Sequence, residues 1–252
     1  MANKRSYDDG CAAAHALDLV GERWALLVVR ELLLGPKRFS DLETDLPQIS
    51  PNVLSTRLKD LEQIGVLIRR KLPAPAASWV YDLSEWGREL EPILMGLGRW
   101  GARSRAHPRQ APVTVATLIT AMKTMFYPPA AEGFAIRLDL KVGDDVFEAR
   151  VENAQLEIGR ATGPRTQPDA VLEADVSTLA GLALGGGSMQ EALEAGTLKI
   201  TGDEQVAERY LGLFRMPEPA PVLEQSKTLE RAARNRPARA PKLVNSKLVS
   251  SV

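Results

Sequence analysis

The chain of 252 residues is 44% hydrophobic and 25% charged, which is ample for one large packed domain or two ordinary ones. It has no apolar run of about 18 residues or more that would predict a membrane span, and its first residues, MANKRSYDDG, lack the apolar core of a secretory signal. A single cysteine excludes an internal disulfide, so we expect a cytoplasmic protein.

The formal net charge of zero averages over unlike regions. Residues 1–112 hold 16 basic and 14 acidic side chains, residues 113–216 hold 9 and 15, and residues 217–252 hold 7 and 3. An acidic middle between more basic ends indicates separate functions, and local charge governs phosphate contact more than the total charge does.

Three helices are predicted in the first part of the chain. Two occupy Cys11–Leu19 and Trp24–Leu34, and a third, short amphipathic helix carries Phe39, Leu42 and Leu46 on its apolar side. A proline follows directly and ends it, because proline has no amide hydrogen and disfavours helix in the residue before it.

A fourth helix follows, with Ser50 as its cap, a proline at its first position and Gly65 as its C-terminal cap. Leu54, Leu58 and Leu61 form its buried stripe. The opposite face and its flank carry side chains that we expect to contact DNA: Ser50, Asn52, Ser55, Thr56, Arg57, Lys59 and Gln63. The competing interpretation is an ordinary solvated helix face.

A two-stranded hairpin is predicted over Val66–Leu83. Arg69, Arg70 and Lys71 concentrate positive charge on its first strand, and Trp79-Val80-Tyr81 forms the returning strand. A basic hairpin beside a polar helix can hold phosphates while the helix reads bases. The order of helix, turn, helix and basic hairpin therefore predicts a winged helix-turn-helix.

A long apolar helix is predicted after the hairpin, capped by Ser84 and kinked at Pro92. Its wide apolar face is formed by Trp86, Leu90, Ile93, Leu94, Leu97 and Trp100. This face either packs on a second subunit, which would give a homodimer on a two-fold DNA site, or covers the core of its own domain. Residues 107–112 break every periodicity and are predicted to link a domain of residues 1–106 to the rest.

These segments resemble the HxlR-type family of bacterial transcriptional regulators. The resemblance is carried by Cys11 and by the runs LDLVGERWALLVVRELLLGPKRFSDL, ISPNVLSTRLKDLEQIGVLIRR and YDLSEWGRELEPIL. It implies a winged-helix dimer that binds operator DNA, with a recognition helix from Ser50 to about Ile64 and a wing from Val66 to Leu83. It also implies that the N-terminal helix takes part in the dimer interface.

Cys11 has two main interpretations. Some HxlR-type regulators sense oxidants or electrophiles through a cysteine at this position, and the start of a helix favours a thiolate, with His15 one turn away. Asp8 and Asp9 oppose thiolate formation, and a buried structural cysteine is the alternative. One cysteine and one histidine make half a metal site, so no metal is expected.

A second domain is predicted over residues 113–216, which makes the fold class α+β. Its predicted elements are a helix at Val113–Phe126, strands at Phe134–Leu140, Val146–Val151, Leu156–Ile158 and Asp169–Asp175, and helices at Ser177–Leu184, Ser188–Ala195 and Asp203–Phe214. Short gaps between the first strands suggest hairpins and hence an antiparallel sheet.

The run PDAVLEADVSTLAGLALGGGSMQEALEAGTLKITGDEQVAERYLGLF resembles the sterol carrier protein type 2-like fold. The resemblance implies a sheet with helices over one face, enclosing a pocket for lipids or other hydrophobic molecules. The expected lining residues, which in the competing interpretation simply fill the core, are Phe134, Leu138, Leu172, Leu182, Leu184, Met189, Leu193, Leu211 and Phe214. Gly185-Gly186-Gly187 is predicted to be a turn at the lip of the pocket and not a phosphate loop.

No catalytic motif is found, so neither an enzyme nor a cofactor is expected. The basic tail of residues 217–252 is expected to be largely mobile. The leading hypothesis is a homodimeric transcriptional regulator that binds double-stranded DNA and responds to a hydrophobic small molecule. The alternatives are a lipid-binding module whose winged domain serves protein contact, and a regulator that senses redox state through Cys11.

Overall fold

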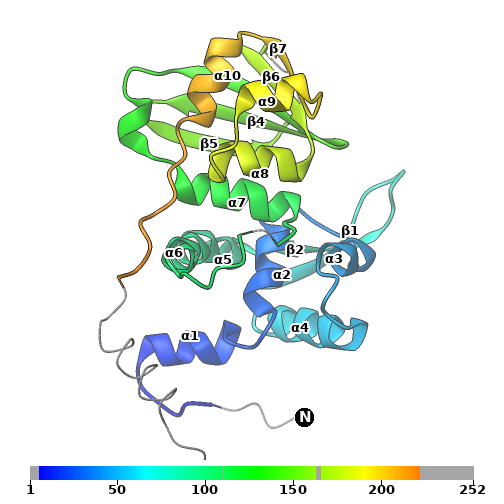
Figure 1. The fold of residues 1–252 in the computed structure, drawn as a ribbon. Helices are drawn as coiled ribbons and strands as arrows, with labels where there is room; N and C mark the ends of the chain where they lie inside the picture. The colour runs from blue at the N-terminus through cyan, green and yellow to red at the C-terminus, as the bar shows by residue number, and fades with distance from the viewer. Residues whose placement is uncertain (1–5, 110, 163–165, 222–252) are drawn as a thin grey trace, which may run out of the picture. The chain divides into compact units, whose positions relative to one another are not determined.

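The computed structural model describes residues 6–109, 111–162 and 166–221, so most of the predicted tail lies outside the described residues. The described residues up to Glu218 form one compact unit. The fold is mixed α+β, with mainly helices and a small hairpin in the N-terminal part and a larger sheet with helices in the C-terminal part (Figure 1). None of the described helices is long and apolar enough to cross a membrane.

The N-terminal part follows the predicted winged helix-turn-helix order. Its elements are α1 (Ala12–Val20), α2 (Ala25–Leu32), α3 (Phe39–Asp45), α4 (Pro51–Gln63), β1 (Leu67–Lys71), β2 (Trp79–Leu83), α5 (Glu85–Arg88) and α6 (Leu90–Ala102). Leu54, Leu58 and Leu61 of α4 are buried in a core shared with α2, α3 and the hairpin. Burying a leucine side chain contributes roughly 1.5–3 kcal/mol, so this stripe determines which face of α4 is left to solvent.

The hairpin of β1 and β2 is extended by one residue from outside it. Leu67 lies opposite Leu83 and Lys71 opposite Trp79 in the antiparallel pair. Beyond the pair, the Lys37 N–H donates to the Tyr81 carbonyl at 3.0 Å and the Tyr81 N–H donates to the Lys37 carbonyl at 2.8 Å. Lys37, two residues before α3, is therefore tied to the returning strand of the wing.

The long helix predicted after the hairpin is two helices, α5 and α6, which are separated at Glu89. Ser84 caps α5 as predicted, by accepting a hydrogen bond from the Gly87 N–H at 2.9 Å. Pro92 lies in the first turn of α6. Because proline cannot donate to the carbonyl four residues earlier, the interruption falls one turn before Pro92 and not at the proline itself.

The C-terminal part is built on a five-stranded sheet of order β5-β4-β3-β6-β7. Its elements are α7 (Val115–Met125), the 3-10 helix η1 (Pro128–Ala131), β3 (Ile136–Val142), β4 (Asp145–Glu152), β5 (Gln155–Arg160), β6 (Ala170–Ala174), α8 (Val176–Leu184), α9 (Met189–Glu194), β7 (Leu198–Gly202) and α10 (Glu204–Leu211). The predicted glycine turn, Gly185–Gly187, connects α8 to α9.

The prediction of a wholly antiparallel sheet is wrong at one pairing. β6 runs parallel to β3, with Leu138 opposite Ala170, because the chain crosses from the edge strand β5 to the other side of β3. Strand β7, which was not among the predicted strands, pairs antiparallel with β6. It ends at Gly202, whose φ of +98° and close approach to the Asp169 carbonyl leave no room for a side chain.

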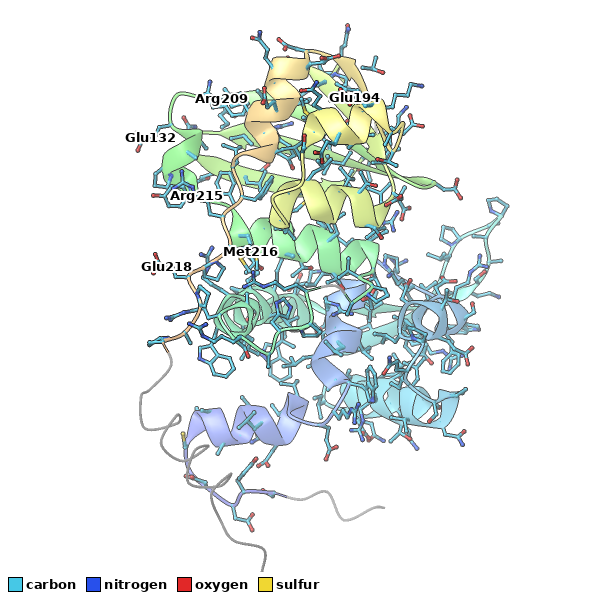
Figure 2. All side chains as sticks on the ribbon, in the orientation of Figure 1. Glu132, Glu194, Arg209, Arg215, Met216 and Glu218 are labelled. Carbon is cyan, nitrogen blue, oxygen red and sulfur yellow. The ribbon has the colours of Figure 1, made fainter. Side chains whose placement is uncertain are left out.

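The sheet has one apolar face and one charged face. Leu138 and Leu140 of β3 are fully buried, whereas Arg137 and Lys141 on the alternate positions are partly exposed. Helices α8, α9 and α10 lie over one side of the sheet (Figure 1). Two arginines at and after α10, Arg209 and Arg215, are labelled in Figure 2. The Arg209 guanidinium lies 4.1 Å from the Phe134 ring centre, and that of Arg215 lies 4.1 Å from the Tyr127 ring centre.

Candidate nucleic-acid interface

Helix α4 turns a polar face to solvent because its leucines face the core. The predicted reading residues on this face are all exposed: Ser50, Asn52, Ser55, Thr56, Lys59 and Gln63. Ser50 precedes the helix in an extended conformation, and its hydroxyl makes no capping hydrogen bond. Lys59 has no hydrogen bond or ion pair with any residue in the described ranges. The face therefore offers short hydrogen-bonding groups and one cation, and Ser50 and Asn52 lie at the positive end of the helix dipole.

Arg57 differs from the other predicted DNA contacts. Its side chain is only 17% exposed, and its guanidinium lies 2.8 Å from the Asp60 carboxylate and 3.6 Å from that of Glu22. Its Nε is buried without a hydrogen-bond partner among the described residues. Arg57 thus ties α4 to the segment before α2, and its charge is less free to meet DNA than that of Lys59.

The wing presents Arg69 and Lys71 on the same face of β1. The Arg69 guanidinium lies 4.9 Å from the Trp79 ring centre and 5.9 Å from that of Tyr81, across the hairpin. Lys71 is exposed and makes no ion pair within the described part of the chain. Stacking restricts Arg69 without neutralising it, so its charge remains able to meet a phosphate.

Arg70 is held differently, by an ion pair within the wing. Its Nη2 and Nε lie 2.9 Å and 3.1 Å from one oxygen of the Asp82 carboxylate. The other oxygen of Asp82 accepts a hydrogen bond from Arg88 at 2.7 Å. Asp82 therefore partly neutralises the positive charge that Arg70 was predicted to offer a phosphate. The same ion pairs join β1 to β2 and α5.

Val53 is a candidate reading residue that the sequence interpretation missed. It is 39% exposed on α4, although it is the only large apolar residue of that helix outside the leucine stripe. At about 100° per residue it lies next to Asn52 on the solvent side. A branched apolar side chain at this position suits contact with a thymine methyl group. The sequence did contain a signal for this role, because Val53 is an apolar residue that falls outside the leucine stripe of the helix.

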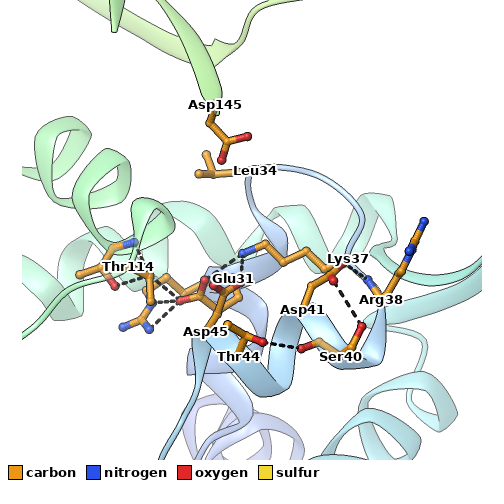
Figure 3. Close-up of polar contacts among 12 residues, drawn as sticks. Glu31, Leu34, Lys37, Arg38, Ser40, Asp41, Thr44, Asp45, Thr114 and Asp145 are labelled. Atoms are coloured by element: carbon orange, nitrogen blue, oxygen red, sulfur yellow. Dashed lines mark hydrogen bonds and ion pairs between the residues drawn. The ribbon is translucent and has the colours of Figure 1, made fainter. Parts of the chain in front are cut away.

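A buried carboxylate, that of Glu31, lies in the last turn of α2. Glu31 is fully buried and accepts hydrogen bonds from Arg30 at 2.7 Å, Lys37 at 3.0 Å and the Thr114 hydroxyl at 2.9 Å (Figure 3). Lys37 also contacts Asp45 of α3 at 2.6 Å. The sequence carries no sign of this cluster, because its members are brought together only by tertiary packing.

Two helices of the N-terminal part expose apolar surface. Ile93, Leu97 and Trp100 of α6 are 55%, 48% and 77% exposed. No residue of α1 is buried, and Leu17 is 52% exposed. The three exposed side chains on neighbouring turns of α6 make this helix a candidate interaction surface.

Cys11 is the residue before α1, and its side chain is exposed. The interpretation of Cys11 as a buried structural cysteine is therefore wrong. Hydrogen bonds from the backbone N–H groups of Ala14 and, to a lesser extent, Ala13 lower the pKa of the thiol. A thiol of this kind is more thiolate-like than an ordinary one at neutral pH.

The nine residues predicted to line an apolar pocket are gathered in the C-terminal core. Six are buried: Phe134, Leu138, Leu172, Leu182, Leu211 and Phe214. Three are partly buried: Leu184, Met189 and Leu193. None lines the open groove of about 890 Å³ that runs along α6, α7 and β5, whose walls include Glu91, Lys123 and Arg150. In this core the Tyr210 hydroxyl has no hydrogen-bond partner among the described residues, and burial raises its pKa.

Comparison with known proteins assigns the N-terminal part. The model of the HxlR-like helix-turn-helix family matches residues 19–108. An uncharacterized HTH-type transcriptional regulator of Bacillus subtilis, YvaP, is 42% identical over 85 residues, which cover 34% of this chain and 79% of YvaP. The chain belongs to the HxlR-like helix-turn-helix family. It is an HTH-type transcriptional regulator.

Other relatives of this HxlR-like regulator are similar over the same part. The HTH-type transcriptional regulator YodB of B. subtilis is 36% identical over 85 residues, covering 34% of this chain and 76% of YodB. The crystal structure of quinone-bound YodB matches 35% of this chain and 92% of its own, with 33% identity and a TM-score of 0.31.

The C-terminal part of the regulator matches a different family. The model of the alkyl sulfatase C-terminal family covers residues 111–220. The inverting sec-alkylsulfatase Pisa1 from Pseudomonas sp. is similar over 44% of this chain and 18% of its own, with 18% identity and a TM-score of 0.40. The sheet and helices of the C-terminal part thus lie outside the region that matches the HxlR-like family, residues 19–108.

Proposed function

We propose that this regulator binds double-stranded operator DNA as a homodimer and responds to a hydrophobic small molecule held by its C-terminal domain. The observation that carries the proposal is the exposed polar face of α4 beside a wing with uncompensated positive charge. The proposed DNA contacts are Ser50, Asn52, Val53, Ser55, Thr56, Lys59, Gln63, Arg69 and Lys71. Arg57 and Arg70 would act by holding α4 and the wing in place.

The homodimer is supported by the exposed apolar faces of α1 and α6. A helix of nine residues such as α1, without any buried side chain, is marginally stable alone in water and gains stability when a second surface covers it. Replacing Leu97 with aspartate should therefore shift sedimentation from dimer to monomer. Gln205→Asp, which adds the same charge at an exposed polar position of α10, is the matched control. Equal sedimentation of the two variants would count against the α6 interface.

For the second half of the chain we propose a sterol-carrier-like ligand domain over residues 113–216, joined by residues 107–112 to a DNA-binding domain of residues 1–106. The apolar core between the sheet and α8, α9 and α10 supports this assignment. The ligand would bind among the nine predicted pocket residues of the core, which would have to move apart. It would not bind in the charged groove along α6, α7 and β5. We propose no catalytic role, because the sequence offers two histidines, one cysteine and no catalytic motif.

DNA binding is tested by fluorescence anisotropy with labelled duplexes from the region upstream of the protein's own coding sequence, with and without hydrophobic cell extracts. We expect salt-dependent binding that changes in the presence of one extract fraction. No binding even at low salt would end the proposal, and lipid binding without DNA binding would favour a lipid-binding module.

A second candidate is redox regulation through Cys11, which its exposure and its lowered pKa support. In the same assay, DNA binding that ignores every extract but changes with diamide would favour this candidate. The Cys11→Ser variant should then lose the diamide response while it keeps its DNA affinity.

A further inference from the structure

Glu31 joins three separate segments of the chain through one fully buried carboxylate. Arg30 comes from its own helix, Lys37 from the segment before α3, and Thr114 from the start of the C-terminal part. A buried carboxylate needs each of its hydrogen bonds, because water cannot replace a lost partner. A displacement of one partner is therefore felt by the others.

Lys37 carries this cluster to the DNA-binding surface. Its ammonium group lies between Glu31 and Asp45, and its main chain forms two hydrogen bonds with Tyr81 of β2. The Tyr81 ring in turn lies 5.9 Å from the guanidinium of Arg69. A shift of Lys37 therefore moves the end of α3 and the returning strand of the wing together.

Thr114 carries the same cluster to the C-terminal part. Its hydroxyl donates to Glu31 at 2.9 Å and accepts from the Thr117 N–H at 3.1 Å, which caps α7. Helix α7 is embedded in the C-terminal core, where Ile119 and Met122 are fully buried. A second contact runs in parallel, because Arg160 at the end of β5 donates to the Leu34 carbonyl at 3.1 Å. The start of α7 cannot move without changing the surroundings of Glu31.

We propose that the chain of contacts Thr114–Glu31–Lys37 couples the C-terminal domain to the wing. A ligand that shifts the core around α7 changes the hydrogen bond between Thr114 and Glu31, and Lys37 passes the change to Tyr81 and Arg69. The ligand's part in this mechanism rests on the proposed function. The link between Thr114 and the wing does not, since it is a property of the chain alone and can be measured without a ligand.

Three substitutions at Thr114 separate the cap of α7 from the link to Glu31. Thr114→Val removes both, and Thr114→Ser keeps both. Thr114→Asp keeps the cap, because aspartate is a good N-cap residue, but places a second carboxylate against Glu31. Hydrogen exchange of the full-length protein is then measured at the Lys37 and Tyr81 amides, which bond to each other's carbonyls.

We expect exchange at these two amides to rise roughly tenfold in Thr114→Val and in Thr114→Asp, and to stay at the wild-type rate in Thr114→Ser, as for the loss of one hydrogen bond to a charged group. Operator affinity, measured by anisotropy, should fall in Thr114→Asp and not in Thr114→Ser. Exchange at the Ala149 amide in the centre of the sheet is the internal reference for global unfolding.

Unchanged protection of Lys37 and Tyr81 in Thr114→Asp would overturn the link. A rise confined to Thr114→Val would overturn it too, since the cause would then be fraying of α7. An equal rise at Ala149 would likewise count against it. If the wild-type protein fails to bind DNA while the exchange pattern holds, the link is supported and only the proposed function fails.

Discussion

Replacing Glu31 with glutamine removes the central charge of the buried cluster and nearly preserves its shape. The amide oxygen can still accept from Arg30 and Thr114, but the amide nitrogen meets the Lys37 ammonium, which lies 3.0 Å from a Glu31 oxygen. One hydrogen bond between charged groups, of about 1.5–3 kcal/mol, is lost and a second is weakened. Lys37 keeps Asp45 at 2.6 Å, so the loss stays below that of an orphaned buried charge. We expect about 2–4 kcal/mol of destabilisation.

Urea unfolding followed by tryptophan fluorescence measures this loss. The four tryptophans, at positions 24, 79, 86 and 100, all belong to the N-terminal part, so the signal reports that part alone. With a slope of about 2 kcal/mol per molar urea, the midpoint should fall by roughly 1–2 M. Glu62→Gln, the same change on an exposed side chain of α4, should stay within about 0.5 kcal/mol of wild type. A common midpoint for both variants would refute a net contribution from the buried cluster.

Three further outcomes follow from the described contacts. Arg69→Ala should reduce the slope of log DNA affinity against log salt concentration by about 0.9. Arg70→Ala should instead lower the urea midpoint of unfolding and leave that slope nearly unchanged. Equal slopes in the two variants would contradict this division of roles. Iodoacetamide should alkylate Cys11 with a midpoint pH below the ordinary thiol value of about 8.5, because the lowered pKa of Cys11 extends the thiolate to lower pH. A midpoint at or above that value would argue against a lowered pKa. Tyr210→Phe removes a buried hydroxyl that has no hydrogen-bond partner among the described residues. Calorimetry should therefore show the C-terminal domain stabilised by about 1 kcal/mol. A loss of stability would reveal an unrecognised hydrogen-bond partner.

The order of the N-terminal elements was predictable because local signals specify them. Ser50 and Pro51 start α4, and Gly65, with a φ of +79°, follows its C-cap residue Ile64. The spacing of its leucines predicted its buried face, and the same spacing left Val53 outside the stripe. The break at Glu89 was placed one turn too late, since the effect of Pro92 falls on a carbonyl four residues earlier.

The sheet of the C-terminal part was predictable only strand by strand. Alternating apolar residues located β3, β4 and β5, because this period follows from the geometry of a single strand. The parallel pairing of β6 with β3 depends on where the chain crosses the sheet, which no local period records. The pocket residues could be recognised as apolar and buried, but burial alone does not distinguish a core from a ligand site.

The sequence by itself determined the order of the N-terminal elements and the polar face of α4, because caps, breaks and apolar spacing act over a few neighbouring residues. The family followed from the resemblance of whole sequence runs. Only the tertiary structure decided which basic residues remain uncompensated. Arg57 pairs with Asp60 on its own helix and also with Glu22, 35 positions away. Arg70 pairs with Asp82, 12 positions away, whereas Arg69 and Lys71 make no ion pair with any described residue. It also decided that Glu31 meets Thr114, 83 positions later. Charge pairing depends on distance in space, and a linear pattern does not contain that distance.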